Sequence, residues 1–396
     1  MIRVIGTWSI VEVYCPRMKK MVLAVGVLIC SSVSLFFTSS ARAEEPTDYQ
    51  PDTSYIGIVR EIGEVLQEDS LFLDETLRRV LVELNSRGSD VWTVEAQYSE
   101  DLSSERDDLR VGERVVVMES HAFPGETRYI ITDKYRLPSM AMLLGIFLLS
   151  AIVFAGRKGF SAIVGLAVSL LILTFYTVPS IMSGGSPFLV ATISAIVIAI
   201  LSLSIAHGFS RQTGIALAST LVTLVISLGL SEFFVSMAKL FGGGTEEAYF
   251  LAFSGLGAID LRGLLLAGII IGVLGVLDDV TTTQTAAVSG FAREGVRGLR
   301  ALYASASSIG REHIVSLVNT LALAYVGASL PLLLLFSVNE GQVPLWLLLN
   351  GQIVTEEIIR TLVGSMALIL AVPLSTIVAA WFYTRFSSLA REDDRL

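Results

Sequence analysis

The stretch that decides the fold is Leu264–Asp279, which reads LLLAGIIIGVLGVLDD. Its residues from Leu264 to Leu277 carry no charge, and at 1.5 Å per residue they extend about 20 Å into a hydrocarbon core about 30 Å thick. Two adjacent carboxylates, Asp278 and Asp279, then follow. Acidic residues at this place oppose both the helix dipole and the preference of cytoplasmic membrane faces for basic residues. We therefore predict a transmembrane helix whose carboxylate pair has a function, rather than a plain helix end.

Small residues accompany this pair along one face of the predicted helix. The positions i, i+4, i+7 and i+11 are occupied by Gly268, Gly272, Gly275 and Asp279. Glycine on a membrane helix allows a partner helix to approach closely. We expect the partner to be the next apolar stretch, which begins at His313 and is rich in small and polar residues.

The predicted site combines the carboxylates with polar residues of that partner helix. Its members are Asp278, Asp279, His313, Asn319 and Thr320. Carboxylates, a histidine and hydroxyls at one depth of a membrane can relay protons or bind a cation. The alternative for His313, which follows Arg311 and Glu312, is an interfacial residue without a ligand.

The whole chain reads as a membrane α-helical protein. With 53% hydrophobic and 16% charged residues and a mean hydropathy of +0.68, it is too apolar for an ordinary soluble domain. About seven transmembrane helices are predicted in a polytopic domain over 138–385. Their apolar stretches lie at roughly 138–156, 160–182, 187–206, 214–238, 261–281, 313–336 and 361–384. A helix lying on the cytoplasmic interface is expected at about 284–308.

A polar segment, 44–137, precedes the helices. It carries 22 acids and 10 bases, and its short runs of β-branched residues alternate with period two between turn-like separators. We predict a small β-barrel or sandwich-like domain that is acidic and extracytoplasmic.

Residues 1–43 have the order of a secretory signal: a basic start at Met18-Lys19-Lys20, an apolar run to Phe37 and an Ala41-Arg42-Ala43 cleavage site. We interpret Met1–Pro16 as an extension upstream of the signal, which begins at Met18. The alternative is an uncleaved first transmembrane helix. Both cysteines, Cys15 and Cys30, lie in this leader, so no disulfide is expected in a mature chain.

The distribution of basic residues predicts the orientation in the cytoplasmic membrane. If 44–137 is outside, the cytoplasmic connections and the tail 386–396 hold ten bases and the outer connections hold three. This matches the positive-inside rule. The chain has no basic surface for nucleic acid, no catalytic residues and no cofactor-binding motif are predicted, and no zinc-ligand spacing occurs on a predicted helix.

Two motifs carry a resemblance to a known family. They are Gly275-Val276-Leu277-Asp278-Asp279-Val280-Thr281-Thr282-Thr283-Gln284 and Ile309-Gly310-Arg311-Glu312-His313, which runs on through Val318 to Pro331. In these motifs the chain resembles the YibE/F-like family of bacterial membrane proteins over about 50–385. The resemblance implies a multispanning protein with an extracytoplasmic amino-terminal domain, and it implies no particular activity.

Three functions are compatible with these features. The leading hypothesis is a transporter or ion-coupled permease in which Asp278 and Asp279 bind a proton or cation, with an unidentified small ion or solute as substrate. The second is a non-transporting membrane scaffold whose outer domain binds a protein partner or which forms a homo-oligomer. The third is an intramembrane enzyme.

Overall fold

The computed structural model describes residues 53–67, 76–85, 91–100, 109–123, 126–253, 259–331, 334 and 343–386. The predicted leader, 1–43, and the tail from 387 on lie outside the described residues. The chain divides between Ser150 and Ala151 into two compact units, which we describe separately.

The first unit contains a closed five-stranded barrel. Its strands are β1 (Thr53–Gln67), β2 (Thr76–Asn85), β3 (Val91–Glu100), β4 (Arg114–Phe123) and β5 (Glu126–Lys134). The order around the barrel is β1-β2-β3-β5-β4, with β1 and β4 antiparallel at the closure and β3 and β5 parallel. The prediction of a small β-domain is confirmed, and of the two alternatives the structure has the barrel.

Alternation along the strands builds the core of this barrel. On β2, Val80, Val82 and Leu84 are fully buried, and on β4 the same holds for Val115 and Val117. Because successive side chains of a strand point to opposite faces, the period-two pattern places one apolar row inside. The residues between these positions, Leu81, Glu83 and Val116, are on the opposite face and are only partly buried.

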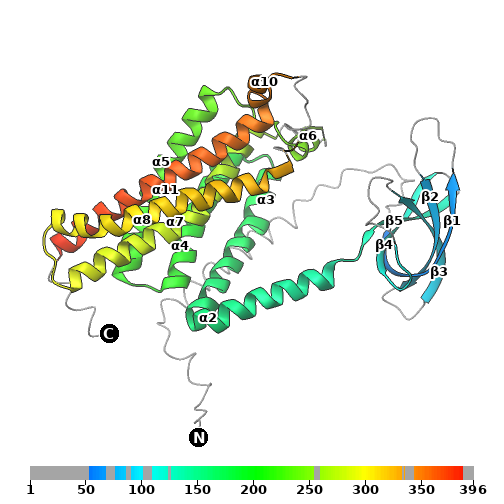
Figure 1. Cartoon of the computed structure of the whole chain (residues 1–396), viewed down its shortest axis with the longest axis horizontal. Coiled ribbons are helices and arrows are strands. Elements are labelled where there is room, and N and C mark those ends of the chain that lie inside the picture. Colours follow the sequence, from blue (N-terminus) through cyan, green and yellow to red (C-terminus); the bar gives the residue numbers. More distant parts are fainter. Residues whose placement is uncertain are drawn as a thin grey trace, which may run out of the picture. The chain divides into compact units, whose positions relative to one another are not determined.

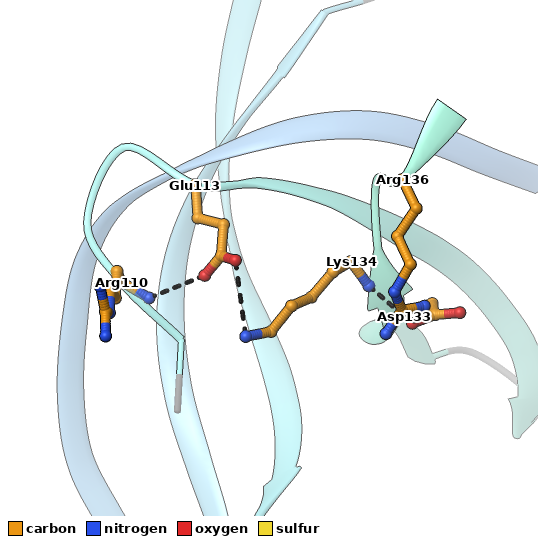
Figure 2. Close-up of polar contacts among 5 residues, drawn as sticks. All are labelled: Arg110, Glu113, Asp133, Lys134 and Arg136. Atoms are coloured by element: carbon orange, nitrogen blue, oxygen red, sulfur yellow. Dashed lines mark hydrogen bonds and ion pairs between the residues drawn. The ribbon is translucent and has the colours of Figure 1, made fainter. Parts of the chain in front are cut away.

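Ion pairs and hydrogen bonds stabilise the end of β5, just before α2 begins in the sequence (Figure 2). Glu113 accepts a hydrogen bond from the backbone N–H of Arg110 at 3.1 Å, and its other oxygen lies 3.4 Å from Lys134 Nζ. Asp133 accepts from the backbone N–H of Lys134 at 2.8 Å and pairs with Arg136. The hydrogen bond from the Lys134 backbone, followed by that from Arg136, holds the pKa of Asp133 below its usual value.

Most of the remaining described chain is helical (Figure 1). They are α2 (Leu137–Ile172), η1 (Leu173–Thr177), α3 (Val178–Met182), α4 (Pro187–His207), α5 (Arg211–Met237), α6 (Glu246–Phe253), α7 (Leu261–Arg293), α8 (Leu299–Ala328), α10 (Leu345–Leu349) and α11 (Gln352–Arg385).

Five helices in the described chain are long and apolar enough to cross a membrane, so the predicted number of seven is not confirmed. They cover Leu137–Met182, Pro187–His207, Arg211–Met237, Leu261–Arg293 and Gln352–Arg385. The first of them contains both of the first two predicted spans. The predicted sixth span, 313–336, overlaps α8, but the helical segment of α8 also carries charged residues and ends at Ala328.

A kink divides the first of these helices. Gly156 has φ 58° and ψ −130°, which is a conformation that only glycine adopts readily. At Gly159 a Cβ atom would collide with the carbonyl oxygen of Ala151. The predicted break between 156 and 160 is therefore present as a kink, with Arg157 and Lys158 beside it.

At the centre of the bundle α5, α7 and α11 pack against one another (Figure 1). Thr220 of α5 lies 2.7 Å from Thr281 of α7, and Thr376 of α11 lies 3.0 Å from Gln284 of α7. A large apolar cluster that includes Ile269 fills the space between them.

These contacts define two ends of the bundle. We name one the glycine-loop end, because Gly242–Gly244 lie there against the starts of α7 and α11. We name the other the arginine end, because α5 starts there at Arg211 while α7 and α11 finish there at Arg293 and Arg385.

The helix expected on the membrane interface at about 284–308 is not one element in the structure. Its first ten residues are the last turns of α7, and its last ten are the first turns of α8. Between them Gly295 and Gly298 have φ values of 97° and 89°, which stop the helix and reverse the chain. Residues such as Val288 and Leu302 are buried in a small apolar cluster of this hairpin.

Candidate functional site

The carboxylate pair lies on α7, whose start is fixed by a cap. The side chain of Asp260 accepts a hydrogen bond from the backbone N–H of Gly263 at 3.0 Å, which satisfies one free donor of the first turn. From there the helix continues without interruption past Asp278 and Asp279 to Arg293. The two carboxylates therefore have the fixed angular separation of neighbouring helical residues, about 100°.

The two carboxylates have different surroundings. Asp278 is partly buried, and its Oδ1 is buried without a hydrogen-bond partner in the described part of the chain. Asp279 is exposed on the outer face of the bundle. The residues that flank the pair along the chain, Leu277 and Val280, are fully buried.

Helix contacts give the depth of Asp278 in the bundle. Thr281, one turn away, lies against Thr220, and Thr220 is about 14 Å along α5 from Arg211 at 1.5 Å per residue. Asp278 is thus about 18 Å from the level of Arg211 and about 24 Å from that of Arg262. The carboxylate lies well inside the apolar length of the helices.

The histidine of the predicted site lies near the level of Asp278 on α8, which runs antiparallel to α7. A Cβ at Gly310 would be 3.2 Å from the amide of Gln284, and a Cβ at Gly272 would be 4.0 Å from the hydroxyl of Tyr325. This register places His313 roughly one helical turn from Asp278. Its Nε2 is buried and, like Asp278 Oδ1, has no partner among the described residues.

The other predicted members lie on the outside of the bundle. Asn319 and Thr320 are exposed, and the Thr320 hydroxyl donates to the carbonyl of Ser316 at 2.9 Å. At Gly268 and Gly275 no heavy atom in the described chain lies within 4 Å of the place that a Cβ would take. The glycine face of α7 therefore makes no close contact with α8 in the described chain, except where Gly272 approaches Tyr325.

Sequence reasoning missed a group of buried polar residues between α5, α7 and α11. Gln284, Thr285, Thr220 and Thr376 are all fully buried. Gln284 Nε2 and Thr285 Oγ1 have no hydrogen-bond partner in the described residues. A signal in the sequence that marks the buried polar face of α5 is a stripe of hydroxyls at four-residue spacing, formed by Ser219, Thr223, Ser227 and Ser231.

A second missed residue is Glu356, which is only 3% exposed near the start of α11. The predicted last span began at 361, which left Glu356 in a loop. No group of three or more His, Cys, Asp or Glu side chains able to hold a metal ion occurs in the described residues.

The helices are apolar and long enough to span a membrane, and one of them carries a carboxylate within its apolar length. These features define a membrane protein with several transmembrane helices. A small barrel precedes the helices in the sequence. The chain belongs to the YibE/F-like family, because the family model described as YibE/F-like protein matches residues 143–385. The resemblance seen in the two motifs is thereby confirmed, and the match begins after the barrel. No curated protein and no solved structure matches the chain.

Proposed function

We propose that the protein is a proton- or cation-coupled permease in which Asp278 is the central ion-binding residue. The observation that carries this proposal is the buried Oδ1 of Asp278, which has no hydrogen-bond partner in the described chain although it lies deep in an apolar helix. A buried polar atom without a partner is costly, and ionisable residues inside membrane segments are typical of ion and proton pathways. Asp279 is the second acid of the pair.

His313 supports the same function. Its buried Nε2 also lacks a partner in the described residues, and it lies roughly one turn from Asp278 in the helix register. Histidine exchanges protons near neutral pH. In the proposed mechanism a proton or cation enters between α7 and α8 and is held by Asp278; where the ion is a proton, it passes between the Asp278 carboxyl group and the His313 imidazole. Asn319 and Thr320 provide polar groups at the outer edge of this path.

The charges at the two ends of the bundle support an orientation with the arginine end in the cytoplasm. The bases described there are Arg157, Lys158, Arg211, Arg293, Arg297, Arg300 and Arg385. Those at the glycine-loop end are Lys239, Arg262 and Arg360, accompanied by more acids, including Glu232, Asp260 and Glu356. By the positive-inside rule the glycine-loop end is extracytoplasmic. We place the barrel outside as well, where it gates or presents the substrate.

The test is ion flux in proteoliposomes. Purified protein is reconstituted, a pH gradient or a gradient of one cation is imposed, and flux is followed with a dye inside the vesicles. We expect Asp278→Asn to lower flux at least a hundredfold and Asp279→Asn to lower it less, because Asp279 is exposed. Flux that survives in the double variant would refute the assignment.

The matched control is Glu312→Gln, which removes an exposed acid of α8 next to His313. It should leave flux within about twofold of the wild type. Each variant is first compared with the wild type by thermal unfolding, so that a misfolded protein is not taken for an inactive one.

A second function, that of a membrane scaffold, is favoured by one feature. The face formed by Gly268, Gly275 and Asp279 is exposed in the described chain, although a carboxylate in contact with lipid tails is unfavourable. A second copy packed on this glycine face would cover it. Cross-linking of single cysteines placed at Gly268 or Gly275 in native membranes tests this, and a folded protein that forms no cross-link at either position would exclude a second copy on this face.

A further inference from the structure

The glycine-loop end contains a pocket of about 240 Å³ that is separate from the Asp278 site. It lies between Thr245, the end of α8 at Ser329 and the first turns of α11. Gly364 of α11 lies at the level of Val273 of α7. Glu356 is therefore about 20 Å from Asp278 along the bundle.

The pocket is lined by a carboxylate whose charge has no counterion. Glu356 is 3% exposed, and its Oε1 accepts a hydrogen bond from the neutral amide of Gln352 at 2.7 Å. No Lys, Arg or His side chain in the described chain forms an ion pair with it. Burying a carboxylate without an ion pair is costly, and a bound cation would offset this cost.

The neighbouring charges do not neutralise Glu356. Arg360 also lines the pocket, and its Nη1 lies 2.8 Å from Glu357 Oε2, so the charges of these two side chains offset each other, while the Arg360 Nε is buried without a hydrogen-bond partner in the described residues. The lining thus has one uncompensated negative charge. A ligand with one positive charge would balance it.

The packing of the loop keeps the Glu356 carboxylate in place. A Cβ at Gly244 would be 2.6 Å from Glu356 Oε2. A methyl group does not fit between them, so glycine at this position is needed for the carboxylate to take its observed place. The hydroxyls of Thr245 and Ser329 are further oxygen atoms on residues that line the pocket.

From this geometry we propose that the pocket at the glycine-loop end binds a singly charged cation, with the Glu356 carboxylate as its counterion. Oxygen atoms of a carboxylate and hydroxyls suit hard cations. The described residues contain no group of three acids or histidines to hold a divalent ion. The volume accommodates either a hydrated alkali metal ion or a small ammonium compound, and these share the chemistry of one positive charge.

The experiment is a cation titration of the full-length protein in detergent, followed by thermal unfolding. Lithium, sodium, potassium and methylammonium chlorides are each varied while N-methylglucamine holds the ionic strength constant. Because a ligand that binds the folded state raises Tm in a saturable way, we expect such a rise for at least one of the four. The cation that raises Tm at the lowest concentration shows whether the pocket prefers an alkali metal ion or an ammonium compound.

Two variants report on the pocket by different means. Glu356→Gln removes the charge, and we expect the half-saturating cation concentration to rise at least tenfold. Gly244→Ala leaves the charge but displaces the carboxylate, and we expect the same direction of change. The matched controls are Glu232→Gln, an acid at the same end that pairs with Arg262, and Gly229→Ala, where a Cβ meets nothing within 4 Å in the described chain. Both should titrate like the wild type.

The titrations can overturn the proposed cation site in the following ways. An equal rise of Tm in wild type, Glu356→Gln and Gly244→Ala, or no saturable rise in the wild type, would overturn the proposal. If Glu356→Gln does not fold, Gly244→Ala provides the comparison. A rise that is lost in Asp278→Asn but kept in Glu356→Gln would place the cation at Asp278, which refutes this inference and supports the permease mechanism.

Discussion

At the scale of single residues, the core of the helical unit depends on a few buried hydrogen bonds. Gln284 is fully buried, its Oε1 lies 3.0 Å from the hydroxyl of Thr376, and its Nε2 has no partner in the described residues. Removing one partner of a buried polar group costs the full desolvation of the other, about 1–3 kcal/mol. We expect Thr376→Val to lower the stability by this amount.

The measurement is the Tm of the full chain in detergent. Thr376→Ser keeps the hydroxyl and is the matched control, so it should lose much less than Thr376→Val. Equal losses in both variants would mean that packing of the methyl group, rather than the hydrogen bond to Gln284, stabilises the contact between α7 and α11.

In the barrel, Glu119 of β4 forms side-chain hydrogen bonds with residues of β1 and β5. Its carboxylate accepts hydrogen bonds from Thr53 at 2.9 Å, Tyr55 at 3.0 Å and Tyr129 at 3.2 Å. Thr53 and Tyr129 lie directly opposite it on β1 and β5. Burial raises the pKa of Glu119, but the three hydrogen bonds and the nearby His121 outweigh it, so the pKa lies below the usual 4.5.

A lowered pKa in the folded state means that the ionised form stabilises the barrel. This contribution is present above pH 4.5, the value of a free glutamate, and is lost as the pH falls through the lower pKa of the folded state. We expect Glu119→Gln to destabilise the barrel by about 1 kcal/mol near pH 7. Calorimetry of the full chain should show a Tm difference from the wild type at pH 7 that shrinks on acidification. A difference that grows instead would contradict this sign.

Some of these residues could be predicted from the sequence and others could not. The place of Asp278 inside an apolar helix could be predicted, because a charge that interrupts an apolar run is visible in the sequence, while its role in ion binding stays a prediction. The contact between Gln284 and Thr376 joins residues 92 apart, and local patterns contain no information about it. Glu356 was missed because charged residues before an apolar run resemble a loop in the sequence, whereas in the structure Gly244 packs against the Glu356 carboxylate.

At the scale of elements, hydropathy places membrane helices but does not orient their faces. Both faces of α7 are apolar, so the helical periodicity of apolar residues does not indicate which face is buried in the bundle. The bulky Leu266, Ile270 and Val273 are buried and the small Gly268 and Gly275 are exposed, because large aliphatic side chains gain more from packing in the interior. The prediction that the glycines contact α8 assumed the opposite face.

The kink in α2 gives a prediction at this scale. Gly156 has φ 58°, and holding another residue in that conformation costs about 1–3 kcal/mol. We expect Gly156→Ala to straighten the helix. Spin labels at positions 154 and 170, with Cys15 and Cys30 replaced by serine, measure this: a straight helix separates the labelled backbone sites by about 24 Å, and the kinked helix separates them by less.

The control for the kink is Gly145→Ala, which changes a glycine of the same helix that has no positive φ and nothing within 4 Å of a Cβ in the described chain. Its label distance should equal that of the wild type. An unchanged distance in Gly156→Ala would mean that the contact between Gly159 and Ala151, and not Gly156, holds the bend.

At the scale of the whole molecule, the kink decides on which side of the membrane every later loop lies. The range Leu137–Met182 is one continuous candidate span of 46 residues, but at 1.5 Å per residue it is about 69 Å long, more than twice a hydrocarbon core. A chain that reverses at Gly156 crosses twice and returns to the side of the barrel. If the segment crosses only once, every later loop lies on the side of the membrane opposite to the one it would have after two crossings.

Two crossings agree with the charges, since Arg157 and Lys158 at the kink then share a side with Arg211 and Arg293. We expect single cysteines at Val111 in the barrel and at Lys239 in the loop after α5 to react with a membrane-impermeant maleimide in intact cells. Cysteines at Phe209 and Glu294 should react only after the membrane is opened. If Phe209 and Glu294 are labelled from outside together with Val111, while Lys239 is protected, the segment crosses once. The arginine end would then be extracytoplasmic, the Glu356 pocket would open to the cytoplasm, and the proposed direction of ion entry would be reversed.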